Sequence, residues 1–337
     1  MKTPYLIAEI SCNHCQNFNK AKKLINVAKK SGANAVKLQT YTADSMTLNL
    51  KKKFKISDGL WKNKKLWDLY NKASTPYAWH APLFKYAKKI GIDIFSTPFD
   101  ENGLALLKKL KCKMYKIASF EMTDLNLIKQ VAKTNKPMII STGMASMQEI
   151  SEAYNVAKKN GCKDITLLYC VSNYPSKVED FNLNNIRILK QKFKCNIGFS
   201  DHSNDNRIAA AAVAAGAVVF EKHLILSKKD KSFDSKFSIN GKEFSEYKRN
   251  INFNFNLLGK DKFFRDTSEN KSKIFRRSIY VIKNIKKGEK FSKKNIKTLR
   301  PALGIEAKYY NKLLNKKSKK NFQYGDVLKK NILKNLL

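Results

Sequence analysis

The hydrophobic positions of this chain fall into eight short apolar runs, and nearly every run ends in residues with polar side chains. The runs cover residues 5–10, 35–39, 94–97, 114–119, 138–142, 165–170, 197–202 and 218–223. Runs of this length predict buried β-strands. The segments between them, such as 20–31 and 146–161, carry apolar residues three and four positions apart, which predicts amphipathic helices. This alternation is typical of βαβ units and a parallel sheet.

Eight βα units within residues 1–262 favour a (β/α)8 barrel, the TIM-barrel fold, in which such units close the sheet on itself. A doubly wound open sheet is the alternative. It would carry a glycine-rich first turn, and the sequence contains no G-x-G-x-x-G. Because the active site of a barrel lies at the C-terminal ends of its strands, the polar residues that end the runs are the candidate functional residues.

Three further segments interrupt or follow the predicted barrel. Residues 42–76 form a long insertion after the second run, and we interpret it as a substrate lid or specificity element. Residues 263–275 are largely polar and predict a linker. Residues 276–337 contain a loosely repeated turn-and-strand pattern and predict a small separate domain, near the size at which a core alone is marginal.

The net charge of +40 raises the question of a polyanionic partner. Of the 67 basic residues, 60 are lysines, and they are spread along the whole chain. Proteins that recognise nucleic acids concentrate charge on one face and rely on arginine. A lysine-rich surface with no specific nucleic-acid partner is therefore favoured. A polyanion-binding barrel without catalysis is the alternative from a different functional class.

Hydropathy and cysteine usage favour a cytoplasmic protein with no membrane span. The longest apolar stretch, 208–220, is too short to cross a bilayer, and the N-terminus makes a poor signal peptide because its apolar run contains an acidic residue. Six cysteines fit a reduced compartment better than a disulfide framework. Cys12 and Cys15 have the spacing of half a zinc site, but no second C-x-x-C follows, so no zinc is expected there.

Two of the four histidines end the seventh and eighth runs, which would be neighbouring strands of a barrel. His202 and His223 could therefore share one divalent cation and leave coordination positions open for substrate. Glu221 lies two residues before His223 and hence on the same side of its strand. The alternative is two separate hydrogen-bonded side chains at the barrel rim. With so few histidines in the chain, the metal site is favoured.

Lysines inside apolar runs predict an anion-binding site. Lys37 lies within the second run and Lys116 within the fourth, and a lysine in an apolar strand is rarely buried without a partner. Hydroxyl groups at the ends of other runs could add hydrogen bonds: Thr97, Ser119, Ser141 and Ser172. Together they predict a cradle for a small molecule that carries phosphate and carboxylate groups. Alternatively, Lys37 could form a Schiff base with a carbonyl substrate.

Several motifs together resemble the sialic acid synthase family. They are Ala8-Glu-Ile-Ser-Cys-Asn-His14, Ala35-Val-Lys-Leu-Gln-Thr40, Ser96-Thr-Pro-Phe-Asp100, Lys116-Ile-Ala-Ser119, Ser141-Thr-Gly-Met144, Gly198-Phe-Ser-Asp-His202 and Glu221-Lys-His223. Residues 275–280 and 299–301 resemble the antifreeze-protein-like (SAF) domain of that family. The resemblance covers essentially the whole chain, and the order and spacing of many motifs make it specific.

The resemblance implies an enzyme that condenses phosphoenolpyruvate with an open-chain amino sugar, releasing phosphate and forming a nine-carbon 2-keto acid. It implies that His202 and His223 bind Mn2+ or Mg2+, and that Glu9 and Glu221 act with them in catalysis. The positions that match phosphoenolpyruvate-binding residues are Lys37, Thr97, Lys116, Ser119, Ser141, Ser172 and Ser200. The positions that match sugar-binding residues are Gln39, Tyr174, Asp234 and Arg300, of which Arg300 would reach the substrate of the partner in a homodimer.

The chain also departs from the family's usual pattern. Residues 61–76, followed by Trp79-His80, differ from the segment that N-acetylneuraminate synthases usually carry. The resemblance therefore favours the sugar precursor of pseudaminic acid, with the precursors of neuraminic and legionaminic acid as the alternatives. Cys15-Gln16 stands where Asn-Gly is usual, which would alter the loop beside Glu9. Ala302 replaces a usual glycine and loses an easy positive-φ conformation.

Overall fold

The computed structural model describes residues 3–50, 54–57, 59–174, 176–259 and 262–334. The chain divides into two compact units, Met1–Gly259 and Lys260–Leu337. Each unit has a hydrophobic core of its own.

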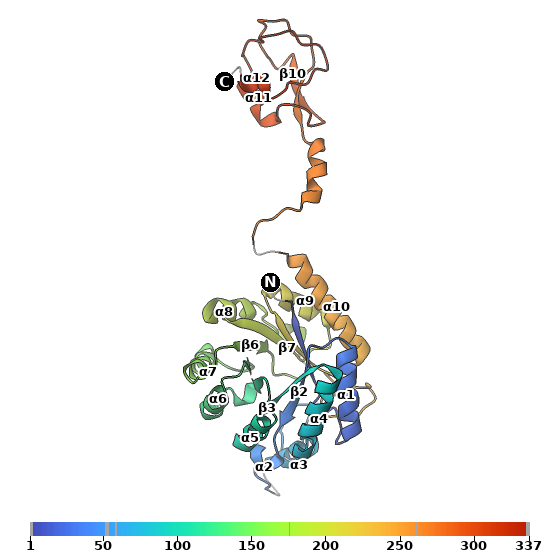
Figure 1. Cartoon of the computed structure of the whole chain (residues 1–337), viewed down its shortest axis with the longest axis vertical. Helices are drawn as coiled ribbons and strands as arrows, with labels where there is room; N and C mark the ends of the chain where they lie inside the picture. The colour runs from blue at the N-terminus through green and yellow to red at the C-terminus, as the bar shows by residue number, and fades with distance from the viewer. Residues whose placement is uncertain (1–2, 51–53, 58, 175, 260–261, 335–337) are drawn as a thin grey trace. The chain divides into compact units, whose positions relative to one another are not determined.

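Eight parallel strands form a closed barrel in the first unit, and they follow one another in chain order (Figure 1). The strands are β1 (Tyr5–Glu9), β2 (Ala35–Thr40), β3 (Asp93–Pro98), β4 (Tyr115–Ile117), β5 (Met138–Ser141), β6 (Ile165–Cys170), β7 (Asn196–Asp201) and β8 (Val219–His223). Each strand coincides with one of the apolar runs, and β8 closes the barrel by pairing with β1. The predicted (β/α)8 fold is confirmed.

Helices cover the outside of the barrel (Figure 1). They are α1 (Phe18–Lys30), α4 (Tyr77–Ile90), α5 (Glu101–Lys109), α6 (Leu125–Ala132), α7 (Met147–Lys159), α8 (Asn184–Phe193), α9 (Asn206–Ala215) and α10 (Gly241–Leu258). Polar N-caps set where they begin. Ser146 and Glu149 form the expected capping box of α7. Helix α1 begins two residues before the predicted start, because the side chain of Asn17 caps it.

The parallel register brings the polar strand ends into one layer at the C-terminal mouth of the barrel. Glu9 is paired in register with Lys37 on one side and with His223 on the other. Ser200 is paired in register with Glu221. Since side chains alternate between the two faces of a strand, residues of this layer can point into the barrel while their sequence neighbours point outward.

The insertion after β2 contains two helices, α2 (Ala43–Met46) and α3 (Leu66–Ala73). The indole N–H of Trp67 donates to Oδ1 of Asp44 at 2.7 Å and thereby joins α3 to α2. The indole N–H of Trp61 donates to the carbonyl oxygen of Phe233, in the segment after β8, at 3.2 Å. The insertion is therefore fastened to the mouth of the barrel.

The second unit is built on a two-stranded antiparallel sheet of β9 (Ser278–Val281) and β10 (Ile296–Leu299). Its core includes Ile279, Phe291 and Leu328. The two repeated turn-and-strand segments pair with each other, because Ile285 and Phe322 exchange backbone hydrogen bonds of 2.9 and 2.8 Å. The helical segments around the sheet are η3 (Thr267–Phe275), η4 (Ala307–Tyr309), α11 (Tyr310–Leu313) and α12 (Asn331–Lys334).

The segment predicted as a linker, 263–275, is more ordered than its composition indicates. Most of it forms the 3-10 helix η3, which Asp266 caps by accepting a hydrogen bond from the backbone N–H of Ser268 at 2.8 Å. Its polar sequence lacks an apolar stripe, so sequence periodicity gave no sign of a helix. Ala302 does not adopt a positive φ, so the missing glycine has no conformational consequence there.

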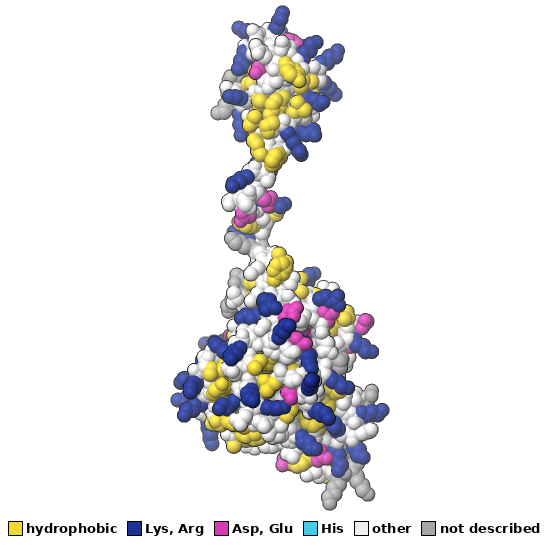
Figure 2. Space-filling view, turned by 90° about the vertical axis from the view of Figure 1, so that its right-hand side faces the viewer, with side chains coloured by type: hydrophobic (Ala, Val, Ile, Leu, Met, Phe, Trp, Pro, Cys, Tyr) yellow, Lys and Arg dark blue, Asp and Glu magenta, His cyan; other side chains and the backbone are white. Residues whose placement is uncertain are grey.

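Lysine and arginine side chains are scattered among acidic and apolar ones on the face shown in Figure 2, without gathering into one basic stripe. This distribution agrees with the interpretation of the +40 charge as a lysine-rich surface. Across the described ranges, no helix is long and apolar enough to cross a membrane.

Candidate active site

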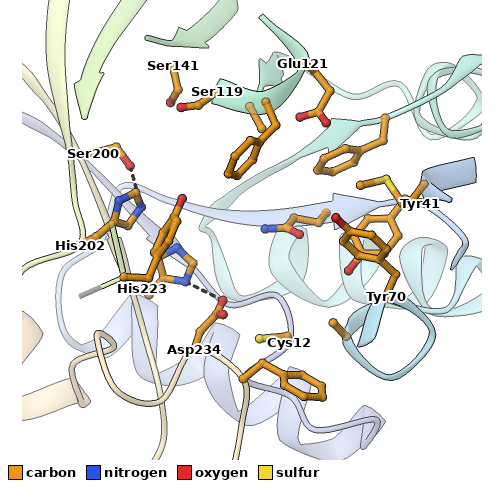
Figure 3. A pocket seen from close by; sticks show the side chains of 18 of the residues that line it. Cys12, Tyr41, Tyr70, Ser119, Glu121, Ser141, Ser200, His202, His223 and Asp234 are labelled. Carbon is orange, nitrogen blue, oxygen red and sulfur yellow. Dashed lines mark hydrogen bonds and ion pairs between the residues drawn. The ribbon is translucent and has the colours of Figure 1, made fainter. Parts of the chain in front are cut away.

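A cavity of about 330 Å³ lies at the C-terminal ends of the barrel strands. Most of the residues singled out from the sequence line it: Lys37, Gln39, Lys116, Ser119, Ser141, Tyr174, Ser200, His202, Glu221, His223 and Asp234. They come from β2, β4, β5, β7 and β8 and from loops that follow strands (Figure 3). Residues far apart in the sequence therefore converge at one place.

Four predicted site residues lie outside the lining of this cavity. They are Glu9, Thr97 and Ser172 in the barrel and Arg300, which is exposed on the second unit. Glu9 is fully buried and ion-paired with Lys37. Thr97 is fully buried too, and its hydroxyl has no hydrogen-bonding partner among the described residues. Ser172 lies behind Gly143, where an added Cβ would meet the serine hydroxyl at 2.1 Å.

His202 and His223 lie side by side, with their ring centroids 5.6 Å apart (Figure 3). Nδ1 of His202 is 3.0 Å from the carbonyl oxygen of Val171, so it donates its proton there and leaves Nε2 unprotonated. Nδ1 of His223 is 3.1 Å from Oδ2 of Asp234. Burial, with a smaller contribution from His223, lowers the pKa of His202 to about 4. The His202 ring is therefore neutral at neutral pH.

This arrangement fits the ligands of a divalent cation. Metal-bound histidines usually direct their second ring nitrogen at a carbonyl or carboxylate oxygen; His202 does so here, and Nδ1 of His223 lies close to the Asp234 carboxylate without forming a hydrogen bond. Within the described part of the chain, no three His, Cys, Asp or Glu side chains are grouped to hold a metal ion. The pair could therefore supply two ligands, with the other positions left to water and substrate.

Two carboxylates and two ammonium groups lie together at the floor of the site. Lys37 Nζ is ion-paired with Glu9 and lies 3.7 Å from Glu221 Oε1, and Lys116 Nζ lies 3.8 Å from Glu221 Oε2. Burial alone would raise the pKa of Glu221, but Lys116 and Lys37 bring it to about 2, so this carboxylate is ionised. The two lysines are therefore not free cations, because carboxylates already balance them.

Burial also opposes the charge on Lys37, yet Glu221 and Glu9 leave its pKa raised. A protonated amine is not a nucleophile, which argues against the Schiff-base alternative. Burial lowers the pKa of Lys116, and Glu221 opposes this in part. The two lysines thus differ in environment although both lie beside the same carboxylate.

Hydroxyl groups form the side of the cavity near Lys116. The backbone N–H of Gly143 donates to Ser119 Oγ at 3.2 Å, and Ser200 Oγ donates to Glu221 Oε1 at 3.3 Å. A Cβ on Gly143 would lie 2.8 Å from Ser119 Oγ, so a side chain there would displace the hydroxyl. The glycine therefore allows the backbone to approach the predicted phosphate cradle closely.

Aromatic rings surround the histidines. The Tyr174 ring centroid lies 4.6 Å from that of His202 and 5.7 Å from that of Trp61. Phe237 packs edge-on against both His202 and His223. Tyr174, which matches a sugar-binding position, is therefore held between the histidine pair and the insertion.

A family model described as the NeuB family matches residues 24–262, and a model of the SAF domain matches residues 276–334. The chain belongs to the NeuB family. The resemblance found in the motifs, including that of the C-terminal domain, is thereby confirmed.

Relatives of this NeuB-family chain include two synthases of Campylobacter jejuni. The chain is 44% identical to the pseudaminic acid synthase, over 97% of this chain and 96% of that protein. It is 39% identical to the N,N'-diacetyllegionaminic acid synthase, over 98% of this chain and all of that protein. Among solved structures, the N-acetylneuraminic acid (sialic acid) synthetase of Leptospira borgpetersenii shares 31% identity and a TM-score of 0.74, over 80% of this chain and 90% of that one.

One acidic residue of this NeuB-family site was not identified from the sequence. Glu121 ends the 3-10 helix η1 (Ser119–Glu121), directly after β4, and lines the cavity (Figure 3). Burial raises its pKa to about 7, and Lys116 opposes the rise in part. Its position two residues after Ser119 was visible in the sequence, but neither spacing nor charge distinguished it from a surface glutamate.

Replacing Glu121 by glutamine is expected to change how the stability of the protein depends on pH. The carboxyl titrates near pH 7 in the folded protein and near its ordinary value of 4.5 in the unfolded chain. The folded state therefore holds the proton more tightly, and the wild type loses stability as the pH rises from about 4.5 through about 7. Glutamine removes this loss. Urea denaturation at about pH 5 and about pH 8 measures the free energy of unfolding of the wild type and the variant. If both proteins lose the same stability between these two pH values, the raised pKa of Glu121 is contradicted.

The loop between β1 and α1 explains the Cys15-Gln16 departure. Cys12, Cys15 and Gln16 have φ values of 54°, 49° and 53°, a left-handed conformation that costs roughly 1–2 kcal/mol per non-glycine residue. The Gln16 side chain donates from Nε2 to the carbonyl oxygens of Lys72 and Ser74, at 3.1 and 2.6 Å. The backbone of this loop therefore has a conformation that suits Asn-Gly, and the Gln16 side chain holds the C-terminal end of α3.

Proposed function

We propose that this chain condenses phosphoenolpyruvate with 2,4-diacetamido-2,4,6-trideoxy-L-altrose and water to give pseudaminic acid and phosphate. Its 44% identity over nearly its full length to a pseudaminic acid synthase supports this substrate pair. The observation that carries the proposal is the convergence of His202, His223, Lys116 and Glu221 in one cavity of a NeuB-family barrel.

The floor of the cavity suits phosphoenolpyruvate. The phosphate and carboxylate of phosphoenolpyruvate would lie beside the two buried lysines, which Glu221 holds together, and Ser119 and Ser141 would donate hydroxyl hydrogen bonds. In the reaction, the C2=C3 π pair of phosphoenolpyruvate forms a bond from C3 to the aldehyde carbon of the sugar, and the C=O π pair moves to the aldehyde oxygen, which takes up a proton. Water adds at C2 and loses its protons as the C–O bond to phosphate breaks, so that C2 becomes the ketone carbon and the electron pair leaves on the phosphate oxygen.

Charge balance supports a divalent cation in this site. Carboxylates already balance the two lysines, and the His202 ring is neutral, so a bound phosphoenolpyruvate would bring uncompensated negative charge. Mn2+ or Mg2+ held by His202 and His223 would offset it and would polarise the sugar aldehyde as a Lewis acid.

The carboxyls of the site differ in protonation and hence in role. Glu221, with a pKa of about 2, is an ionised acceptor that can orient the attacking water or a substrate hydroxyl. Glu121, with a pKa of about 7, is partly protonated at neutral pH and can donate a hydrogen bond to the sugar. Glu9 is buried behind the cavity lining, so it would act by holding Lys37 in place.

Phosphate release measured with phosphoenolpyruvate and each candidate sugar tests this proposal. We expect turnover with the pseudaminic acid precursor. Turnover with N-acetylmannosamine alone would refute it. Turnover with the legionaminic acid precursor alone would instead favour the activity named for the N,N'-diacetyllegionaminic acid synthase, to which the chain is 39% identical. Salt-sensitive DNA binding with no turnover on any sugar would favour a polyanion-binding protein.

We also propose that the active form is a homodimer in which the second unit of one copy supplies Arg300 to the barrel of the other. Arg300 is exposed, and its neighbours Leu299 and Leu303 expose 37% and 59% of their surface. Apolar side chains grouped around an exposed arginine are typical of a surface that another protein covers.

Mixing two inactive variants is expected to restore activity if the site is shared between subunits. His202→Ala disables the barrel, and Arg300→Ala disables the second unit. A mixed dimer then contains one intact site, so random exchange of subunits would give about a quarter of wild-type activity, since half of the dimers are mixed. Mixing Lys116→Ala with His202→Ala is the control, because both changes lie in the barrel and no intact site results. Equal activity in the two mixtures would contradict a shared site.

A further inference from the structure

One wall of the cavity is a helix face made almost entirely of hydrocarbon. Helix α3 turns Leu66, Leu69, Tyr70 and Ala73 toward the cavity, at positions i, i+3, i+4 and i+7. Ile56, from the same insertion, extends this wall. An apolar stripe with this spacing usually packs against a protein core. Here all of its members border the space that the substrates would occupy. We call these five residues the apolar wall.

The apolar wall lies across the cavity from the histidine pair, whereas the Glu121 carboxyl is close enough to Tyr70 to add to the effect of burial in raising the pKa of its hydroxyl. Figure 3 shows Tyr70 on the side of the cavity opposite His202 and His223. The lysine and glutamate ion pairs belong to the strand ends of the barrel, whereas the wall belongs to the insertion. A sugar bound between them would present one end to ionised groups and the other end to leucine and isoleucine side chains.

The apolar wall is held in place from behind. Gln16 donates to two carbonyl oxygens at the C-terminal end of α3, and Trp67 joins α3 to Asp44. Nε2 of the buried His14 ring lies 3.1 Å from Oγ1 of Thr75, a buried residue just after the helix. These contacts fix the distance between the wall and the floor, so the wall can discriminate between substituents by shape and polarity.

We propose that the apolar wall selects the acceptor sugar by contacting a methyl-terminated substituent, and that it disfavours a sugar with a hydroxyl group at that place. This inference rests on the proposed function, because it concerns the sugar of that reaction. A hydroxyl pressed against Leu66 and Leu69 would lose its hydrogen bonds to water without gaining a partner. An apolar pocket rejects an added hydroxyl by roughly 10- to 100-fold.

The proposed sugar carries two kinds of methyl-terminated substituent, the deoxygenated carbon C6 and the acetamido groups. Two pairs of sugars distinguish them. One pair differs only by a hydroxyl on C6, and the other differs only by a hydroxyl in place of the acetamido group on C4. The quantity measured is the ratio of kcat/KM within each pair, from phosphate release at saturating phosphoenolpyruvate.

The variants Leu66→Asn and Leu69→Asn replace hydrocarbon by an amide of similar size. We expect the wild type to prefer the methyl-terminated sugar of one pair by roughly 10- to 100-fold, and each variant to reduce that preference to a few-fold. The KM for phosphoenolpyruvate should stay unchanged, because the floor is untouched. Leu48→Asn is the matched control, since Leu48 belongs to the insertion but is 66% exposed and does not line the cavity.

The outcomes separate this inference from the proposed function. If the asparagine variants reduce the kcat/KM ratio of the C6 pair, the wall contacts the deoxygenated carbon. If they reduce the ratio of the other pair, the wall contacts the acetamido methyl group. Unchanged ratios in both pairs, with turnover intact, would overturn the inference. A wild type inactive on every sugar would instead overturn the proposed function. If the asparagine variants fail to fold, Leu66→Ala and Leu69→Ala replace them. The KM of these alanine variants should then rise for the methyl-terminated sugar alone. An equal rise in KM for both sugars of each pair would overturn the inference.

Discussion

Replacement of His202 or His223 by alanine is expected to lower turnover by about a thousandfold or more and to abolish Mn2+ binding. The two rings lie with their centroids 5.6 Å apart; Nδ1 of His202 donates to the carbonyl oxygen of Val171, and Nδ1 of His223 lies 3.1 Å from Oδ2 of Asp234. Polarisation of a carbonyl by a metal ion is worth several kcal/mol. Since about 1.4 kcal/mol is tenfold in rate, its loss corresponds to roughly three orders of magnitude. Phosphate release measures turnover, and electron paramagnetic resonance measures free Mn2+.

His80→Gln is the matched control for these two variants. His80 is also fully buried, but its Nε2 lies 2.8 Å from the hydroxyl of Thr40 and the residue does not line the cavity. We expect this variant to lower the melting temperature while its Mn2+ affinity stays at the wild-type value. Retained Mn2+ binding and turnover in both His202→Ala and His223→Ala would show that the histidine pair is not a metal site.

Replacement of Lys222 by methionine is expected to destabilise the barrel by about 3–5 kcal/mol. The Lys222 ammonium is almost completely buried on the outer face of β8, where its Nζ lies 3.2 Å from Oδ2 of Asp201 and donates to the carbonyl oxygen of Ser203. The Tyr247 ring of α10 covers it, 5.8 Å from Nζ to the ring centroid. Methionine would fill much of the space but would leave the buried carboxylate of Asp201 without its countercharge.

Urea denaturation of Lys222→Met measures this effect directly. In the double variant Asp201→Asn/Lys222→Met neither charge of this buried pair is left, so a substantial part of the lost stability should return, as expected for residues that interact. Lys85→Met, at an exposed position of α4, should change the free energy of unfolding by less than about 0.5 kcal/mol. A loss below about 1 kcal/mol in Lys222→Met would show that the ion pair contributes little to stability.

The sequence was sufficient to predict the eight strands and the end of the barrel that carries the site. Parallel barrel strands are buried on both faces, so each appears as an apolar run, and a polar residue near the end of a run stands out. His202, His223, Lys37 and Lys116 were all identified in this way and all converge. The segment predicted as a linker contains η3, which the sequence did not indicate, because a short exposed 3-10 helix leaves no hydrophobic period.

Sequence spacing could not show how the charged residues pair. From the sequence, Lys37 and Lys116 were predicted to bind an anionic substrate. The structure places Glu221 between them and Glu9 beside Lys37. Nor could sequence spacing distinguish Glu121 from a surface glutamate, since burial of this carboxyl depends on how segments distant in sequence close around it. Distances between strand ends and degrees of burial arise only when the barrel closes.

The sequence by itself determined the barrel, the small C-terminal domain and most of the chemical groups at the strand ends, because hydrophobic periodicity and local motifs are properties of neighbouring residues. The tertiary structure decided which charges neutralise one another and which residues stay behind the cavity lining. It also decided that the apolar stripe of α3 lines the cavity instead of packing into a protein core. These features depend on contacts between segments far apart in the chain, and the free energy of burying or pairing a group is set by those contacts.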